Sequence, residues 1–156
     1  MAERDYKLPI PVADEESRPF FEGAKQRKLM ILRCTRCGTW RLPTRERCAD
    51  CWSTEFEWAQ ASGRGKLYTF GIMHQQYHPS FAEAIPYNFA FVELEEGPRL
   101  VTNIVDCPNE ELRTDMPVEA VFDDVSEETT LIRFRPRSLT PGPSPSQRER
   151  GDRRSG

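Results

Sequence analysis

Four of the five cysteines in this 156-residue chain form two Cys-x2-Cys pairs, Cys34 with Cys37 and Cys48 with Cys51, separated by ten residues. Each pair can form a turn that places both sulfurs on one side, and two facing turns supply a tetrahedral four-sulfur site of the kind zinc favours. Four thiolates close the coordination shell, so no position remains for a metal-activated water. The spacing therefore predicts a structural metal. We expect zinc, with iron as an open alternative because tetrahedral sulfur coordination also suits iron.

Two other kinds of cysteine chemistry are possible for these residues. A pair of redox dithiols would need a thioredoxin-like setting, yet neither pair opens a helix after a parallel strand. The fifth cysteine, Cys107, stands before Pro108 and is either a buried, unreactive thiol or a nucleophile. Since neither His74 nor His78 is near it in sequence, the pattern favours the unreactive thiol.

Common catalytic motifs are missing from the sequence. It has no Gly-x-Ser-x-Gly elbow, no Gly-x4-Gly-Lys-[Ser/Thr] loop and no Gly-x-Gly-x2-Gly after a strand. The string SGRGK at 62–66 precedes an expected strand rather than a helix, so it lacks the helix N-terminus that phosphate cradles use. We expect a tight turn there that offers Arg64 and Lys66 to an anion, and a protein without a complete active site.

The charges are distributed unevenly along the chain. Residues 1–56 hold eleven Lys/Arg against nine Asp/Glu, whereas residues 57–138 hold seven against fourteen. A small cationic unit is thus joined to an acidic one. The longest aliphatic stretch is only four residues, 29–32, and no apolar segment follows the mixed-charge start, so we expect a cytoplasmic protein that does not enter a membrane. Cysteines in that compartment bind metal more often than they form disulfides.

Composition divides the chain into four stretches. Residues 1–28 are expected to form an arm and a short helix over 14–28, with Asp14 as its N-cap. Residues 29–56 form the four-cysteine ribbon, and residues 57–138 follow a period of two that is typical of β-strands. Residues 139–156 contain one apolar residue and three prolines, which predicts a disordered tail.

The stretch from 57 to 138 contains five strand-like runs, a tight turn at 95–98 between the second and third, and helical turns at 109–114 before the fourth. A five-stranded barrel with a helix in that place is an OB-fold, so the expected fold is mainly β. Four aromatic residues occupy alternating positions at which we expect the barrel core: Tyr68, Phe70, Phe89 and Phe91.

Several strings of this sequence are those of a known family: FFEG at 20–23, LRCTRCG at 32–38, CADC at 48–51, FEW at 56–58, SGRG at 62–65, PY at 86–87, VELEEGPRL at 92–100, MPVE at 116–119 and FRP at 134–136. They resemble the zinc-ribbon/OB-fold proteins of domain of unknown function thirty-five, which accompany thiolases and related acyl-CoA enzymes. The resemblance implies an N-terminal helical segment, a rubredoxin-like ribbon and an OB barrel. It also implies a non-catalytic accessory subunit that binds acyl-CoA and docks on a thiolase-like or hydratase-like enzyme of acyl-CoA, lipid or sterol metabolism. Trp52 departs from the pattern, because glycine is common at that position.

Coenzyme A carries phosphates and an adenine, and the chain has groups suited to both. Guanidinium groups bind phosphate through paired hydrogen bonds, and an indole ring can stack on a base. The residues that we expect to contact it are Arg36, Trp40, Arg41, Arg45, Arg47, Arg64 and Lys66. The alternative function is a nucleic-acid-binding module, since ribbons and OB-folds often serve that purpose. The acidic second unit speaks against it, because grooves that track a nucleic-acid strand are positively charged.

Overall fold

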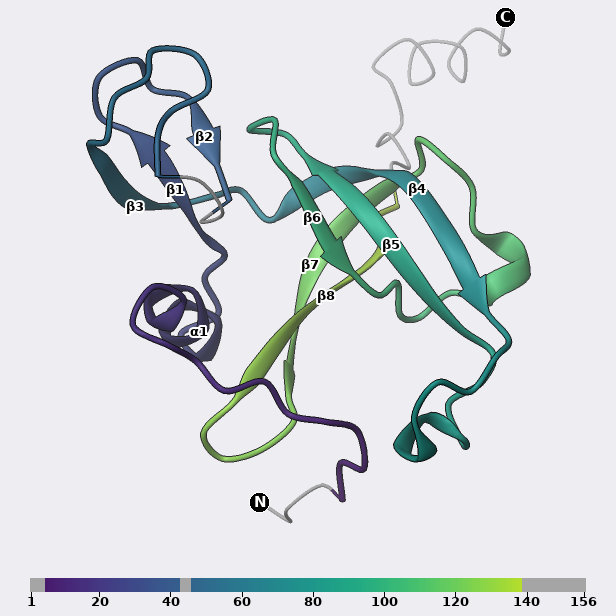
Figure 1. Ribbon diagram of the computed structural model, residues 1–156. Coiled ribbons are helices and arrows are strands. Elements are labelled where there is room, and N and C mark those ends of the chain that lie inside the picture. Colours follow the sequence, from purple (N-terminus) through teal and green to yellow (C-terminus); the bar gives the residue numbers. More distant parts are fainter. Residues whose placement is uncertain (1–4, 43–45, 139–156) are drawn as a thin grey trace, which may run out of the picture.

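The structure is a computed structural model that describes residues 5–42 and 46–138 and contains two β-sheets (Figure 1). One helix precedes the sheets, α1 (Arg18–Lys25). The first sheet has the order β2-β1-β3 and consists of β1 (Met30–Cys34), β2 (Trp40–Arg41) and β3 (Phe56–Gln60). The second has the order β6-β5-β4-β7-β8 and consists of β4 (Arg64–Met73), β5 (Tyr87–Leu94), β6 (Arg99–Thr102), β7 (Pro117–Asp124) and β8 (Thr130–Pro136). Short 3-10 turns occupy η1 (Pro79–Phe81) and η2 (Asn109–Glu111).

The second sheet is a curled, five-stranded half-barrel of the expected OB type, so the prediction of a mainly β fold is confirmed. The turn between β5 and β6 is closed by the Gly97 amide, which donates to the Leu94 carbonyl at 2.9 Å. The two ends of the sheet meet at Phe134 of β8, whose amide donates to Asn103 and whose carbonyl accepts from Val105 at 2.8 Å. The Phe134 side chain is fully buried, so it anchors the seam and the core together.

Helix α1 is shorter than the expected helix over 14–28. The Asp14 carboxylate does not cap it; it accepts from the amide and the hydroxyl of Ser17 and so stabilises the turn before the helix. The helix ends where Arg27 takes a left-handed conformation with φ 61°. There the Lys28 amide donates to the Gly23 carbonyl at 2.8 Å and the Arg27 amide donates to Ala24 at 3.0 Å, which is the Schellman pattern of a helix end.

Three of the four aromatic residues expected in the barrel core do not lie there, and that prediction was wrong. A β-bulge between Leu67 and Thr69 shifts the register of β4, so Tyr68 is 43% exposed whereas Phe70 packs against the core. On β5 the buried positions are 88, 90, 92 and 94, so Phe89 and Phe91 point outward. Both faces of β5 are apolar in sequence, and periodicity therefore could not choose between them.

The ribbon and the barrel share one hydrophobic core. Leu29 and Ile31, at the start of β1, belong to the same buried cluster as Leu67, Val92 and Phe134 of the barrel. Strand β3 pairs with β1 along its whole length, so the expected division between residues 56 and 57 falls inside β3. The ribbon is therefore packed on the barrel rather than joined to it by a linker alone.

No helix in the described ranges is long and apolar enough to cross a membrane. The expected disordered tail, residues 139–156, lies outside the described residues.

Candidate metal centre and the surfaces around it

The two Cys-x2-Cys pairs fold into nearly identical turns. In the first, the Cys34 amide donates to Thr39 at 2.8 Å and the Gly38 amide donates to the Cys34 carbonyl at 2.9 Å. In the second, the Cys48 amide donates to Ser53 at 2.9 Å and the Trp52 amide donates to the Cys48 carbonyl at 3.0 Å. The residue after the second sulfur is left-handed in both turns, with φ 79° at Gly38 and φ 63° at Trp52. A bulky side chain thus occupies a conformation that glycine adopts without strain.

These turns bring the four sulfurs into one cluster. The Sγ atoms of Cys34 and Cys51 are 3.6 Å apart, those of Cys37 and Cys48 are 3.5 Å apart, and all four lie within 4.8 Å of one another. A metal–sulfur bond of about 2.3 Å places tetrahedral sulfurs about 3.8 Å apart. The donor set and its spacing therefore fit one tetrahedral metal ion, and the four predicted ligands come together as expected.

Thr39 and Asp50, two polar residues that the sequence analysis did not identify, support this cluster. Thr39 Oγ1 lies 3.2 Å from Cys37 Sγ and donates to the Asp50 carboxylate at 2.6 Å. The hydrogen bond with Thr39 lowers the pKa of the Cys37 thiol to about 6. The amide of Cys37 lowers the pKa of the Cys34 thiol in the same way. These two effects favour the thiolate, the form that binds metal, at Cys34 and Cys37. At Cys51 the Ser53 amide acts in the same direction, but burial and the three neighbouring sulfurs outweigh it and raise the pKa of that thiol to about 12.

Arg41 lies beside the sulfur cluster, and its guanidinium is less accessible than that of an arginine exposed for phosphate binding. Its guanidinium stacks on the Phe56 ring at 3.4 Å from the centroid. Its Nε and Nη1 are buried without a hydrogen-bond partner in the described part of the chain. Burial lowers the pKa of Arg41, and the thiolates of Cys48 and Cys34 act in the opposite direction. Only part of this guanidinium is open to an outside ligand.

The other residues expected to contact coenzyme A fall into three groups. Arg36 and Arg47 are exposed on the ribbon, whereas Trp40 is half-buried, with the Arg33 guanidinium 5.7 Å from its ring. Arg64 and Lys66 lie on β4 and already pair with acids: Arg64 with Glu95 at 3.5 Å, and Lys66 with Glu93 at 3.5 Å and Asp115 at 3.9 Å. Arg45 lies outside the described residues. Coenzyme A binding by these residues stays a prediction.

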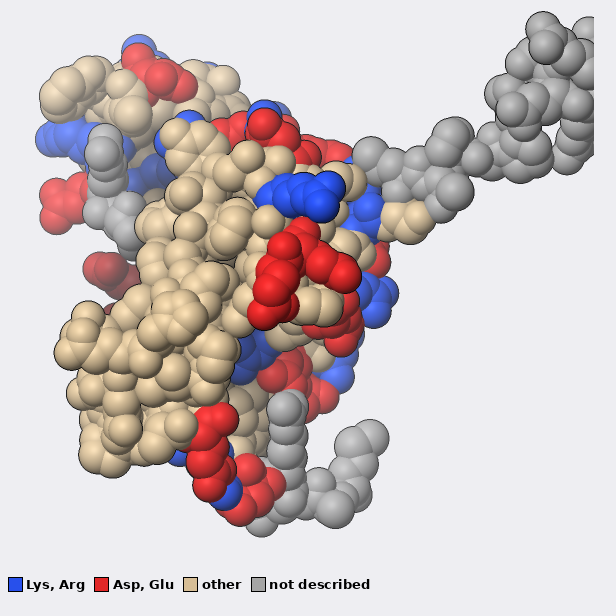
Figure 2. Space-filling view, turned by 90° about the vertical axis from the view of Figure 1, so that its right-hand side faces the viewer, with Lys and Arg blue, Asp and Glu red and all other residues tan. Residues whose placement is uncertain are grey.

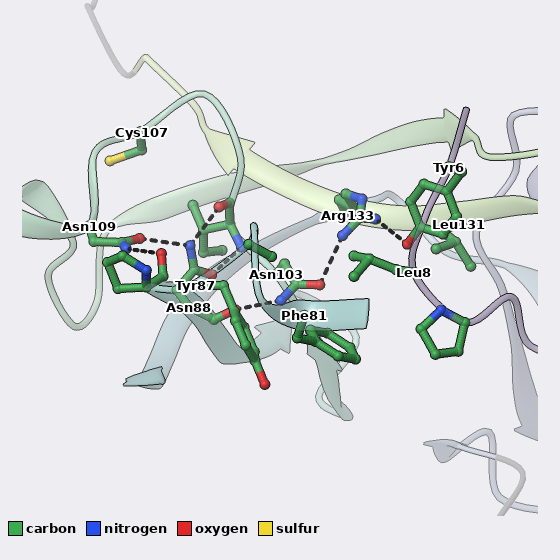
Figure 3. A pocket seen from close by; sticks show the side chains of 14 residues that line it. Tyr6, Leu8, Phe81, Tyr87, Asn88, Asn103, Cys107, Asn109, Leu131 and Arg133 are labelled. Atoms are coloured by element: carbon green, nitrogen blue, oxygen red, sulfur yellow. Dashed lines mark hydrogen bonds between the residues drawn. The ribbon is translucent and has the colours of Figure 1, made fainter. Parts of the chain in front are cut away.

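A cavity of about 400 Å³ opens between the N-terminal arm, β5, the loop after β6, and β8 (Figure 3). Its floor is a hydrogen-bonded network: Asn88 donates to the Ile104 carbonyl and to Asn109, Asn103 donates to the Asn88 carbonyl, and Arg133 donates to Asn103. Arg133 also donates to the Tyr6 hydroxyl at 3.1 Å, which holds the arm over the cavity. These polar groups mainly bond one another, so the network ties the arm to the barrel.

Cys107 lies at the rim of this cavity and is partly buried. Burial, and to a smaller extent the Glu111 carboxylate, raises the pKa of its thiol. A protonated thiol is a weak nucleophile, so its surroundings favour the unreactive alternative. His78 is likewise engaged, because its Nδ1 accepts from the Ser80 amide at the start of η1.

Comparison with known proteins identifies both parts of the chain. Residues 21–57 match the family model of the rubredoxin-like zinc ribbon domain of ChsH2, and residues 58–123 match that of the ChsH2 C-terminal OB-fold domain. The DUF35 domain-containing scaffold protein of Methanocaldococcus jannaschii is 43% identical over 106 residues, which cover 67% of this chain and 74% of that protein. This chain belongs to the DUF35 family. The resemblance found in the sequence is confirmed.

Other proteins similar to this chain carry enzyme-related names. Benzoylsuccinyl-CoA thiolase subunit BbsA of Thauera aromatica is 32% identical over 110 residues, covering 69% of this chain and 74% of BbsA. The probable enoyl-CoA hydratase alpha subunit of Thermomonospora curvata is 39% identical over 128 residues, 82% of this chain, but this chain spans only 40% of its length. Among solved structures, the Ltp2-ChsH2(DUF35) aldolase matches with a TM-score of 0.72 and 38% identity, covering 81% of this chain and 98% of the matched chain.

Proposed function

We propose that this DUF35 protein is a non-catalytic accessory subunit of an acyl-CoA enzyme. It holds a structural zinc ion, docks on a thiolase-like or hydratase-like partner and binds acyl-CoA. The observation that carries the proposal is that the ribbon and barrel together match proteins named as scaffold and thiolase subunits, over 67% and 69% of this chain. A cytoplasmic location suits this role, because reducing conditions keep the four thiols available for metal.

The metal site supports a scaffolding role. Cys34, Cys37, Cys48 and Cys51 together supply four sulfurs, which fill a tetrahedral shell and leave no coordination position for substrate or water. The ion therefore holds the two turns together and takes no part in a reaction. Elemental analysis of protein purified without added metal should give one zinc per chain. One iron per chain, together with visible absorption, would show that the structural metal is iron instead of zinc.

Docking is tested by purifying a tagged chain from its own organism under native conditions and identifying bound proteins by mass spectrometry. We expect a thiolase-like or hydratase-like acyl-CoA enzyme in stoichiometric amount. The purified chain alone should show no thiolase or hydratase turnover, whereas hydratase activity of the isolated chain would replace the accessory role by an enzymatic one.

Binding of acyl-CoA is tested by isothermal titration calorimetry with coenzyme A. Arg36 and Arg47 are the best candidates, because both are exposed on the ribbon and make no ion pair with another described residue. A hydrogen bond to a charged group contributes about 1.5–3 kcal/mol, so Arg36→Ala or Arg47→Ala should weaken binding about tenfold or more. Arg135→Ala is the matched control, since Arg135 pairs with Glu119 on the barrel at 2.9 Å. Equal loss in all three variants would mean that the binding is unspecific.

A further inference from the structure

We propose that the outward side of β4, β5 and β6 is the surface through which this chain binds its partner enzyme. We call this surface, defined by Tyr68, Phe89, Phe91 and Val101, the aromatic face. The occupant that fits it is a folded enzyme subunit with an apolar patch bordered by basic side chains. This inference rests on the proposed function and adds the site of contact.

Strand register places Phe89, Phe91 and Val101 next to one another. Tyr68 is the bulged residue, and its ring lies under the guanidinium of Arg99, the residue that pairs with Glu93 on the same side of the sheet. Phe91 pairs with Thr69 on one side and with Val101 on the other, so all three point outward from neighbouring strands. Phe89 lies two residues from Phe91 on the same side, opposite Gly71. A Cβ atom at Gly71 would lie 2.4 Å from the Phe89 ring, which shows that the ring lies flat across β4 at this glycine.

The aromatic face is apolar yet uncovered. Tyr68 is 43% exposed, Phe89 37% and Val101 61%. Residues 67–92 contain one charged side chain, Glu83, and residues 100–105 contain none. Figure 2 shows a broad area without Lys, Arg, Asp or Glu on the left of the view, bordered by acidic side chains with some basic ones among them. Contiguous apolar surface of this kind marks interaction sites, and aromatic residues are enriched in them.

The surrounding charges select a protein with a basic border. The two cations beside the face, Lys66 and Arg99, both pair with the Glu93 carboxylate, and the Arg99 guanidinium covers the Tyr68 ring at 3.7 Å from its centroid. A nucleic-acid strand could stack on the rings, but its phosphates would be repelled by the acidic border. A partner with lysines or arginines around an apolar patch would form both apolar contacts with the rings and favourable charge contacts with the border.

The backbone under the aromatic face is fixed before any partner arrives. Strand β5 is hydrogen-bonded to β4 on one side and to β6 on the other, and its inward side chains belong to the barrel core. A rigid, preformed surface loses little conformational entropy on binding, so its apolar area contributes more fully to affinity.

The test uses the acyl-CoA enzyme that co-purifies with the wild-type chain, isolated and immobilised for binding measurements. Val101→Glu and Tyr68→Glu should each weaken binding at least tenfold, because each would desolvate a charge against an apolar patch. Val12→Glu is the matched control, since Val12 is 94% exposed on the N-terminal arm and should bind like wild type. Metal content and far-UV circular dichroism establish that each variant is folded.

The outcomes separate this inference from the proposed function. If wild type binds the enzyme and both face variants bind equally well, the aromatic face is not the docking surface, and the accessory role stands. If no acyl-CoA enzyme co-purifies with wild type, the proposed function fails and the docking surface fails with it. Binding of an oligothymidine strand that Tyr68→Glu abolishes would assign the face to nucleic acid instead. Dimerisation in sedimentation that Val101→Glu abolishes would assign it to a second copy of this chain.

Discussion

The ribbon and the barrel reach their folds by different means. Between residues 33 and 58 the described buried residues are two cysteines and one serine, Cys34, Cys48 and Ser53, so that part of the ribbon has almost no apolar core. The barrel buries Leu67, Val92 and Phe134 together with several other aliphatic residues. Sulfur–metal bonds must therefore do in the ribbon what hydrophobic burial does in the barrel.

The aromatic residues report on the two regions separately. All three tryptophans, Trp40, Trp52 and Trp58, lie in the ribbon, whereas the four tyrosines lie in the arm and the barrel. Tryptophan emission therefore follows the ribbon, and tyrosine signals follow the rest of the molecule.

Removal of the metal should have the largest effect. Structural zinc contributes roughly 10–16 kcal/mol of apparent binding energy in zinc-finger peptides. A strong chelator should therefore unfold the two Cys-x2-Cys turns, here called knuckles, and shift tryptophan emission to the red. Hydrogen exchange should show loss of protection in 34–55, while amides of β5 and β7 stay protected because their core needs no metal. Cys48→Ser should reproduce the effect, and Cys107→Ser is its control. An unchanged tryptophan spectrum after complete chelation would contradict the metal's role in the ribbon.

Truncation in the barrel should have the converse effect. Phe134 is fully buried at the seam, and replacing a buried phenylalanine by alanine costs about 3–5 kcal/mol. Urea unfolding of Phe134→Ala, followed by circular dichroism, should show this loss. The purified variant should still bind one metal ion per chain. Phe81→Ala, a substitution in the exterior η1 turn, should cost much less.

The same contrast explains what could be predicted from sequence. Cysteine spacing predicts the metal ligands, because two pairs of sulfurs with two residues between the members of each pair can meet in few ways. The strand count and the turn at Gly97 predict the barrel. The side of β5 that faces the core could not be predicted, since Phe89 and Phe91 are as apolar as Ala90 and Val92. A bulge at Tyr68 carries no sequence signal of its own. The contacts of Arg41 and Arg64 were also hidden, because they depend on side chains far along the chain.

The contact between α1 and the barrel should be sensitive to pH. Both Nη atoms of Arg27 donate to the Asp124 carboxylate, at 2.8 and 2.5 Å, and Thr130 donates to it at 2.6 Å. Arg27 and Thr130 hold the pKa of Asp124 well below its usual range. A lowered pKa adds stability above the unfolded-state pKa of about 3.9, and that stability is lost as the pH falls toward the folded-state value.

Because the Arg27–Asp124 pair is half-exposed, Arg27→Ala should lower the free energy of unfolding by at most about 1 kcal/mol at pH 7. The difference from wild type should shrink below about pH 4, where protons compete for the carboxylate, and in high salt. Arg113→Ala, at an exposed arginine outside any ion pair among the described residues, should show neither trend. A difference that persists unchanged at pH 3 would mean that Arg27 stabilises the helix end through packing.

The smallest effect should come from substitutions at Gly38 and Trp52, which should change the stability of the two knuckles in opposite directions. Trp52 and Gly38 occupy equivalent left-handed positions, and this conformation costs a non-glycine residue about 1–2 kcal/mol. Gly38→Ala should therefore destabilise the ribbon. Trp52→Gly should relieve that strain, and the added freedom of the unfolded chain should reduce the gain to below about 1 kcal/mol. Since Trp52 is 71% exposed, little packing is lost with its ring. Chelator competition should show slower metal loss for Trp52→Gly and faster loss for Gly38→Ala; faster loss in both would show that the indole itself protects the second knuckle.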